Sequence, residues 1–200
     1  KSAGKLSEYR KQTAKKFVKA VTEELKFLDM PNVTLKVDIK TGKLTSTGMD
    51  TVEFLISANK GEEPKPISKI ASGGELSRIM LGIKSVLANK DDTDTLIFDE
   101  IDTGISGRTA QKVSEKMALI ARSHQVICIT HLPQIAAMAD IHFLIEKNIK
   151  DGFTTTSINR LSDQEIITEL ARMLGGSRIT DLVMDNAAQM KEFADNLKKQ

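Results

Sequence analysis

The spacing of apolar and polar residues predicts a chain that alternates between helices and strands. Apolar residues recur every three or four positions over residues 5–28, as on one face of an amphipathic helix, and Pro31 marks the end of this pattern. Residues 33–39 and 51–57 instead alternate apolar with polar side chains, which is the period of a half-exposed strand. Glycines in the segment between these two runs favour a turn, so we expect a β-hairpin.

The remainder of the chain continues this alternation. Helices are expected at 74–88, 108–122, 133–138, 163–173 and 180–198, and strands at 95–98, 125–130, 141–146 and 154–160. Asp151 and Gly152 are expected to form the turn between the last two strands. Strands that alternate with helices are typical of an α/β fold, and the apolar run 126–129 fits a mostly parallel sheet that helices cover on both faces.

Composition and charge exclude only a few classes of function. With 200 residues, of which 40% are hydrophobic, the chain can bury one core with a small appendage. A net charge of +2 does not identify a nucleic-acid-binding protein, and the few aromatic residues argue against a platform that stacks nucleobases. The sequence has no apolar run of membrane-spanning length and no recognisable signal peptide.

The single cysteine and the three histidines do not predict a metal or disulfide site. Cys128 has no intrachain partner and lies in an apolar run, so we expect a buried core residue of a protein in a reducing, cytosolic compartment. The histidines and the cysteine lack the spacing of a zinc site. His124 and His142 are expected on the surface or in ordinary packing.

Two adjacent carboxylates follow a predicted buried strand. Residues 95–98 are β-prone and place Asp99 and Glu100 at the carboxyl end of the strand, where α/β sheets bind their ligands. There, Asp99 can support a Mg²⁺ ion that bridges phosphate oxygens, and Glu100 can orient or deprotonate an attacking water. The alternative is that both residues are only the polar start of a loop after a core strand.

A glycine-rich segment precedes the helix predicted at 74–88. Gly73 and Gly74 allow the backbone to approach a phosphate closely, and a helix N-terminus presents free N–H groups to an anion. Ser72 and Glu75 also have the spacing of a capping box, which is a purely structural role. The two interpretations are compatible, so the segment predicts either a helix cap or a cap that also binds phosphate.

His131 directly follows the strand predicted at 125–130, which places it at the same sheet edge as Glu100. A neutral imidazole there can hydrogen-bond a terminal phosphate or the attacking water. The sequence contains no phosphate-binding P-loop, because neither Gly4 nor Gly82 lies in a Gly-x-x-x-x-Gly-Lys-Ser/Thr motif. We therefore expect the chain alone to bind ATP poorly and to be inactive.

The order of these motifs resembles the C-terminal half of an ABC-type ATPase head. Three longer stretches narrow the resemblance: residues 98–107, 130–134 and 171–176 closely resemble the RecN family of bacterial DNA repair proteins. Members of this family are SMC-like ATPases of double-strand break repair. The resemblance therefore implies ATP and Mg²⁺ as ligands and DNA as a partner.

The resemblance also implies a larger protein. Residues 1–30 would form the base helix of a returning coiled coil, and residues 31–200 would form the C-terminal lobe of the head. The P-loop would lie in an N-terminal lobe of the same protein, which agrees with a chain that starts at Lys1 inside a helical pattern and without an initiator methionine. The whole protein would be cytoplasmic, associated with the bacterial nucleoid and independent of membranes.

In ABC-type heads, two heads enclose two ATP molecules, so the resemblance divides the site between two copies of the protein. Ser72 and Gly74 would contact the γ-phosphate held by the opposite head, whereas Asp99, Glu100 and His131 would act on the nucleotide of their own head. The implied roles are catalytic for Glu100 and His131, ATP-binding for Ser72, Gly73, Gly74, Glu75, Asp99 and Ser106, and Mg²⁺-binding through the nucleotide for Asp99. Transporters usually carry Asp near the position of Ser106, where a turn crosses the dimer interface.

Other functions fit parts of the sequence. An ABC transporter subunit usually carries proline after the catalytic glutamate, whereas this chain has Ile101. A mainly structural, chromosome-organising SMC head would tether DNA with little turnover, although Glu100 is present for hydrolysis. An α/β domain with coincidental motifs is disfavoured by the joint order of the motifs. The lysines from Lys5 to Lys26 are a candidate DNA surface or, alternatively, a solvated basic face.

Overall fold

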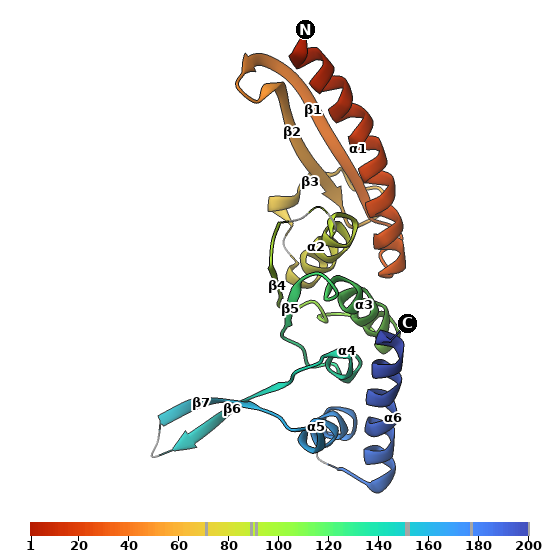
Figure 1. Ribbon diagram of the computed structural model, residues 1–200, viewed down its shortest axis with the longest axis vertical. Helices are drawn as coiled ribbons and strands as arrows, with labels where there is room; N and C mark the ends of the chain where they lie inside the picture. Colours follow the sequence, from red (N-terminus) through yellow and green to blue (C-terminus); the bar gives the residue numbers. More distant parts are fainter. Residues whose placement is uncertain (71, 89, 91, 151–152, 177, 200) are drawn as a thin grey trace. The chain divides into compact units, whose positions relative to one another are not determined.

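The computed structural model describes the chain except for residues 71, 89, 91, 151–152, 177 and 200, and for residues 149 and 150 only the backbone is described (Figure 1). In chain order, the elements are α1 (Ser2–Phe27), β1 (Thr34–Thr45), β2 (Gly48–Ser57), β3 (Lys65–Pro66), the short 3₁₀ helix η1 (Ile67–Lys69), α2 (Gly73–Leu87), β4 (Thr95–Phe98), α3 (Gly107–Ile120), β5 (Gln125–Cys128), α4 (Pro133–Met138), β6 (Phe143–Lys150), β7 (Phe153–Arg160), α5 (Asp163–Gly175) and α6 (Asp181–Lys198). The turn expected at Asp151 and Gly152 lies outside the described residues.

The chain divides into two units. The first comprises Lys1–Gly104 and Leu119–Ile129, and the second comprises Ile105–Ala118 and Thr130–Gln200. The first unit contains the antiparallel sheet β1-β2-β3 and the parallel pair β4-β5, whereas the second contains the antiparallel pair β6-β7. Helices and small sheets in this arrangement confirm the expected α/β class. None of the helices described is long and apolar enough to cross a membrane.

In the first unit, α1 lies along the hairpin of β1 and β2 (Figure 1). Phe17 of α1 meets Phe54 of β2 edge to face, with ring centroids 5.7 Å apart. The helix is amphipathic, and its buried stripe packs on the hairpin and on α2. The core buries Val21, Leu25, Val33, Leu35, Ile56, Ile79 and Ile83. Burial of this apolar surface, rather than helix propensity alone, stabilises the helix.

The hairpin is longer than the two alternating runs predicted. β1 and β2 pair from Thr34 with Ser57 to Thr45 with Gly48, with an irregularity between Thr41 and Thr45. Apart from Leu44 and Met49, the added residues are polar or glycine and carry no alternating pattern, so hydrophobic periodicity does not detect them. A hydrogen bond to α1 stabilises the turn of the hairpin: Arg10 Nη2 donates to the Thr47 carbonyl oxygen at 2.9 Å.

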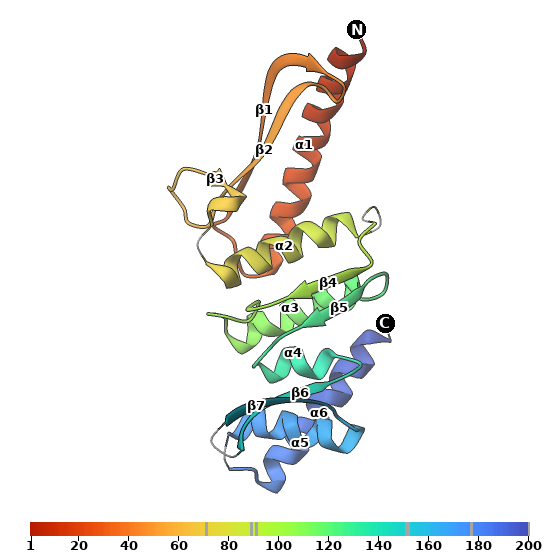
Figure 2. The same cartoon turned by 90° about the vertical axis from the view of Figure 1, so that its left-hand side faces the viewer.

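One face of the parallel pair β4-β5 (Figure 2) carries exposed apolar side chains among the described residues. Leu96 and Phe98 point inward and are buried. The alternate residues Ile97, Ile127 and Ile129 are 68%, 44% and 50% exposed, respectively. In the described part of the chain, burial of both faces of this parallel pair is thus not seen, although its strands are as apolar as those of a fully buried sheet.

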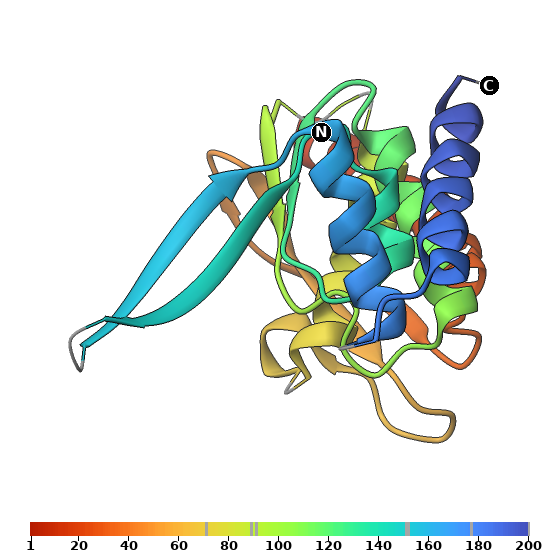
Figure 3. The same cartoon turned by 90° about the horizontal axis from the view of Figure 1, so that it is seen from below.

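The second unit builds its own core from α4, α5 and α6. Its buried residues are Ala137, Met138, Ile166, Leu170, Ala171, Ala187 and Ala194. A capping box of Ser162 and Glu165 begins α5, in which the Ser162 backbone N–H donates to Glu165 Oε2 at 2.7 Å. The hairpin β6-β7 extends away from these helices (Figure 3), and Phe143, Ile145 and Ile158 on it are more than half exposed.

We expect Leu25→Ala to destabilise the first unit, because Leu25 is 1% exposed and its loss leaves a cavity between α1 and the hairpin. Substitutions of this kind cost about 2–5 kcal/mol of unfolding free energy. Urea unfolding followed by circular dichroism measures the change. Leu44→Ala is the matched control, because Leu44 is 75% exposed and its truncation should cost less than about 0.5 kcal/mol. Equal midpoints for the two variants would contradict the assigned core.

Candidate functional site

The first turn of α2 packs directly against the segment that follows β4. A Cβ atom added at Gly74 would lie 2.9 Å from the Glu100 carbonyl oxygen and 3.0 Å from that of Thr103. A Cβ atom added at Gly73 would collide with the carboxylate of Glu100. Backbone atoms cannot move aside as the end of a flexible side chain can, so Gly74 is required by the close approach itself.

The start of α2 is fixed by Ser72. Its backbone is extended (φ −92°, ψ 116°), and its Oγ accepts a 3.4 Å hydrogen bond from the Glu75 backbone N–H. Ser72 therefore acts as an N-cap, as the capping interpretation expects. Ser72 and Gly73 are exposed, so the remaining N–H groups of the first turn face an accessible surface at the positive end of the helix dipole.

Asp99 and Glu100 follow β4 directly and begin a turn that we call the carboxylate turn (residues 99–104). Both residues are exposed, whereas Ile101 and Asp102 behind them are buried. Glu100 has a left-handed backbone with φ of 56°, which costs a non-glycine residue about 1–2 kcal/mol. The Thr103 backbone N–H donates to the Glu100 carbonyl oxygen at 3.1 Å and closes the turn. Backbone strain of this kind is frequently found at functional sites.

Two side chains of α2 donate hydrogen bonds to backbone carbonyl oxygens of the carboxylate turn. Ser77 Oγ donates a 2.8 Å hydrogen bond to the Asp99 carbonyl oxygen. Arg78 Nη1 donates to the carbonyl oxygens of Ile101 at 3.2 Å and Thr103 at 3.0 Å. Arg78 is 7% exposed, and its burial lowers the pKa of the guanidinium, while the negative charge of Glu75 opposes that shift.

Sequence reasoning did not identify Ser77 or Arg78. One signal was present: Gly74, Arg78 and Gly82 are spaced four residues apart and share one face of α2, and the structure buries all three. A charge between two glycines on the buried face of a helix is unusual. It indicates that the guanidinium has specific partners inside the fold.

The second unit contains the other two predicted residues, Ser106 and His131. Ser106 is exposed just before α3, and its Oγ lies 3.4 Å from Thr109 Oγ1. His131 is exposed between Thr130 and α4. Because the carboxylates belong to the first unit and these residues to the second, the grouping of His131 with Glu100 and the role of Ser106 stay predictions.

Cys128 at the end of β5 is half-buried rather than part of the core, which corrects the sequence-based expectation. The strand ends here, so its last residues are less covered than the alternation predicts. Desolvation, reinforced by the charges of Asp102 and Asp99, raises the pKa of the Cys128 thiol to about 12. The thiol is therefore protonated at neutral pH and unsuited to nucleophilic chemistry.

The described residues offer only part of a metal site. Within the part of the chain that the structure describes, no three His, Cys, Asp or Glu side chains gather as metal ligands. Asp99 supplies one exposed carboxylate, the type of oxygen donor that Mg²⁺ prefers. This donor fits an ion that takes its remaining ligands from phosphate and water.

Solved structures show which fold the chain shares. One belongs to a study of ATP-driven dimerization and DNA-stimulated activation of SMC ATPases; it is 19% identical with a TM-score of 0.50, and the match covers 86% of this chain and 99% of that one. Another is the Smc head domain with a coiled coil and joint from Pyrococcus yayanosii, at 22% identity and a TM-score of 0.56 over 81% of this chain and 29% of that one. The fold is that of the C-terminal half of an ABC-type head.

Sequence relatives define the family, although no family model matches the chain. The DNA repair protein RecN of Bacillus subtilis (strain 168) is 45% identical over 212 residues, covering 98% of this chain and 37% of the relative. RecN of Haemophilus influenzae is 42% identical over 194 residues, covering 96% and 35%, respectively. The chain belongs to the RecN family. It spans little more than a third of the length of these curated relatives.

We expect Cys128 to resist alkylation while the chain is folded. At pH 8, a rise of the pKa from 9.0 to about 12 lowers the thiolate fraction by about 1,000-fold. Reaction with iodoacetamide, followed by mass spectrometry, should therefore be far slower in buffer than in 8 M urea (roughly the concentration that unfolds most domains). Cys128 is the single thiol of the chain, so the signal has one source. Similar rates in both conditions would contradict the raised pKa.

Proposed function

We propose that this chain is the C-terminal head lobe of a RecN-type ATPase that acts in DNA double-strand break repair and recombination. The observation that carries the proposal is the contact of Gly73 and Gly74 with the carboxylate turn. It places an accessible, glycine-bearing helix N-terminus and two exposed carboxylates on adjacent segments of one unit. Membership of the RecN family supports ATP hydrolysis as the reaction class of this arrangement.

The proposed roles follow from the chemistry of each group. Ser72, Gly73, Gly74 and Glu75 form the first turn of α2, whose free N–H groups suit the γ-phosphate of a nucleotide held by a second head. Asp99 would hold Mg²⁺ through the nucleotide, and Glu100 would orient and deprotonate the attacking water. His131 would hydrogen-bond the terminal phosphate or that water, and Ser106 would contribute where two heads meet. ATP, when bound, would supply the γ-phosphoryl group, which transfers to water as ADP leaves.

The uncovered apolar surfaces support a missing P-loop lobe. Ile97, Ile127 and Ile129 form an exposed apolar face on the β4-β5 pair, and parallel sheets are normally covered on both faces. In the second unit, Phe143 and Ile145 expose apolar side chains on the β6-β7 hairpin. We propose that the N-terminal lobe of the same protein covers these surfaces and supplies the phosphate-binding loop that this sequence lacks.

The proposed partners extend to a second head and to DNA. Two heads would close on two nucleotides as a homodimer, with residues 1–30 as the base of a returning coiled-coil helix and residues 31–200 as the lobe. The exposed face of α1 carries Lys11, Lys15 and Lys19, which suit phosphate contacts whose affinity falls with salt. A DNA repair protein of this kind would act in the bacterial cytoplasm, at the nucleoid.

The alternative functions are less well supported. The curated relatives are DNA repair proteins rather than transporter subunits, and Ile101 stands where transporters usually have proline. A mainly structural head would not need a strained, positioned glutamate after β4. The left-handed backbone of Glu100 therefore favours a head that hydrolyses ATP.

The first test is reconstitution of the divided head. We expect no MgATP turnover by this chain alone, and turnover when the P-loop lobe of the same protein is added. Phosphate release is measured with and without linear duplex DNA, and stimulation by DNA is expected. A P-loop lobe with its lysine replaced is the control for contaminating ATPase. Turnover by this chain alone would contradict the division of the site, and turnover that DNA does not alter would count against the repair role.

The second test asks whether Ser72 and Glu100 of one chain serve different nucleotides. In the full-length protein, Glu100→Gln should lower kcat by about 10²–10⁴-fold. Ser72→Ala, which removes the phosphate contact without adding bulk, should lower kcat by about 10- to 100-fold. Mixing the two proteins should restore roughly a quarter of wild-type turnover, because random pairing makes half the dimers mixed and each contains one intact site.

The matched control for Ser72→Ala is Thr180→Ala, because Thr180 Oγ1 also caps a helix and accepts from the Val183 N–H at 3.4 Å. Both variants lose about 1 kcal/mol of capping stability, but the Thr180 variant should retain full turnover. No recovery on mixing would contradict the assignment of Ser72 and Glu100 of one chain to different nucleotides.

A further inference from the structure

Three backbone carbonyl groups around Glu100 accept hydrogen bonds from two adjacent side chains of α2. We propose that Arg78, assisted by Ser77, is a positioning residue for hydrolysis: it fixes the carboxylate turn, and with it Glu100, to the helix whose first turn binds phosphate. The inference rests on the proposed roles of Glu100 and of the first turn of α2. It assigns a further function to residues that touch neither the nucleotide nor the water.

Packing alone does not explain why a charged side chain occupies the buried position of Arg78. Burying a guanidinium costs free energy unless hydrogen bonds replace its water, and an apolar residue would occupy a helix face at lower cost. Here the carbonyl oxygens of Ile101 and Thr103 replace that water at 3.2 and 3.0 Å. Both bonds come from Nη1, whose two N–H groups lie in the plane of the guanidinium. This plane fixes their directions toward the two acceptors, whereas the rotatable ammonium of lysine does not.

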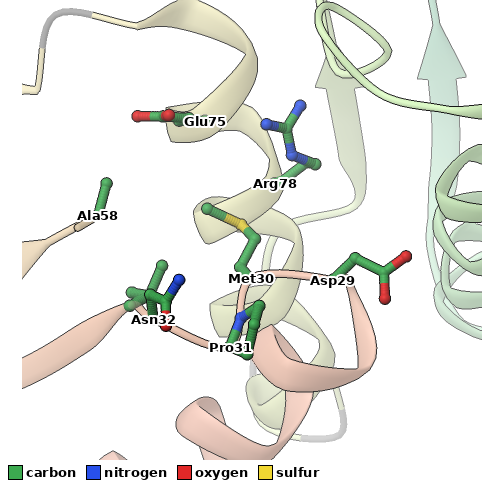
Figure 4. Close-up of a pocket in the computed structure, with 8 residues that line it drawn as sticks. Asp29, Met30, Pro31, Asn32, Ala58, Glu75 and Arg78 are labelled. Atoms are coloured by element: carbon green, nitrogen blue, oxygen red, sulfur yellow. The ribbon is translucent and has the colours of Figure 1, made fainter. Parts of the chain in front are cut away.

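Hydrogen bonds rather than tight packing fix the guanidinium. Arg78 and Glu75 of α2 line a hollow of about 160 Å³. Asp29, Met30 and Pro31, from the connection between α1 and β1, also line it (Figure 4). The side chain therefore borders open space on one side and meets the carboxylate turn through its donors. Shortening it to lysine would leave room but would change the donor geometry.

The conformation of Glu100 explains why its turn needs such support. A left-handed backbone at φ 56° persists only where surrounding contacts determine it. Ser77 binds the carbonyl oxygen immediately before Glu100, at 2.8 Å, and Arg78 binds two carbonyl oxygens that follow it. Without these three bonds, the chain after β4 is free to relax to a lower-energy conformation, and the Glu100 carboxylate moves with it.

The contact at Gly74 removes the remaining freedom between the two elements. A Cβ atom at this position would lie only 2.9 and 3.0 Å from two carbonyl oxygens, so α2 cannot tilt toward the carboxylate turn without displacing it. Arg78 and Ser77 prevent the opposite movement, away from the turn. Phosphate binding at the first turn of α2 is therefore transmitted to Glu100 through a contiguous set of contacts.

The test measures kcat and KM for MgATP in the full-length protein. We expect Arg78→Lys to lower kcat by about 10- to 100-fold, because a displacement of about 1 Å at the reacting groups has this effect, with KM within about threefold of wild type. Ser77→Ala, which removes one of the three bonds, should lower kcat by about 3- to 10-fold. The control is Ser85→Ala, on the same helix, whose Oγ donates to Glu24 Oε2 at 3.4 Å and which should leave kcat unchanged.

A double variant separates positioning from a general loss of structure. If Arg78 acts through Glu100, then Arg78→Lys should have no further effect on kcat in the Glu100→Gln protein, because the carboxylate it positions is already absent. Multiplied losses in the double variant, or wild-type kcat in both Arg78→Lys and Ser77→Ala, would overturn the proposal. A fall in ATP affinity that matches the fall in kcat would also overturn it.

The single variants distinguish this inference from the proposed function. Wild-type turnover in Glu100→Gln would remove the catalytic role of Glu100, and the positioning role would fall with it. An inactive Glu100→Gln together with a fully active Arg78→Lys would leave the proposed function in place and remove only the positioning role.

Discussion

Backbone atoms of α2 and of the carboxylate turn come so close at Gly74 that a methyl group would not fit between them. This approach determines where both elements begin and end. Ser72 caps α2 five residues before Ser77, whose hydroxyl donates to the Asp99 carbonyl oxygen. The end of β4 therefore has to lie where Glu100 is close to the same helix. The same packed contact thus fixes the positions of the first turn of α2, which is proposed to bind phosphate, and of the carboxylates in the carboxylate turn. Neither segment can shift independently of the other.

Each unit of the chain has a core of its own, yet both expose apolar surface. The first unit buries the residues between α1, the hairpin and α2, and the second buries the residues between α4, α5 and α6. Ile97 on β4 and Phe143 on β6 remain largely exposed. Two strands cannot hydrogen-bond all their backbone groups to each other, and an isolated pair with one bare face is weakly stabilised. These exposed faces are the surfaces on which the proposed N-terminal lobe would pack.

The sequence predicted the elements with strong patterns and missed the interactions that have none. The strand Thr95–Phe98 and the helix Pro133–Met138 have the predicted bounds, because apolar runs and a proline at the first helical turn mark them. The segments with Ser72, Gly74 and Glu100 were found from their motifs. Arg78 was not, because its partners are backbone carbonyls 23 and 25 residues away, and carbonyl groups leave no trace in residue identity. The exposure of Ile97 on β4 was missed because an apolar strand has the same sequence pattern whether one of its faces is buried or both are.

The contact inside one chain has a consequence for a dimer of heads. In the proposed arrangement, the first turn of α2 serves the nucleotide of the opposite head, whereas Glu100 serves the nucleotide of its own. Because Gly74, Ser77 and Arg78 join these two segments, closure on one nucleotide sets the position of the base that acts on the other. Each site keeps its own base and phosphate contacts, but the two nucleotides would influence each other, since a ligand that favours one arrangement of the contact favours it for both. Cooperative hydrolysis would then follow from local packing within each lobe, with no need for a long-range pathway through the head.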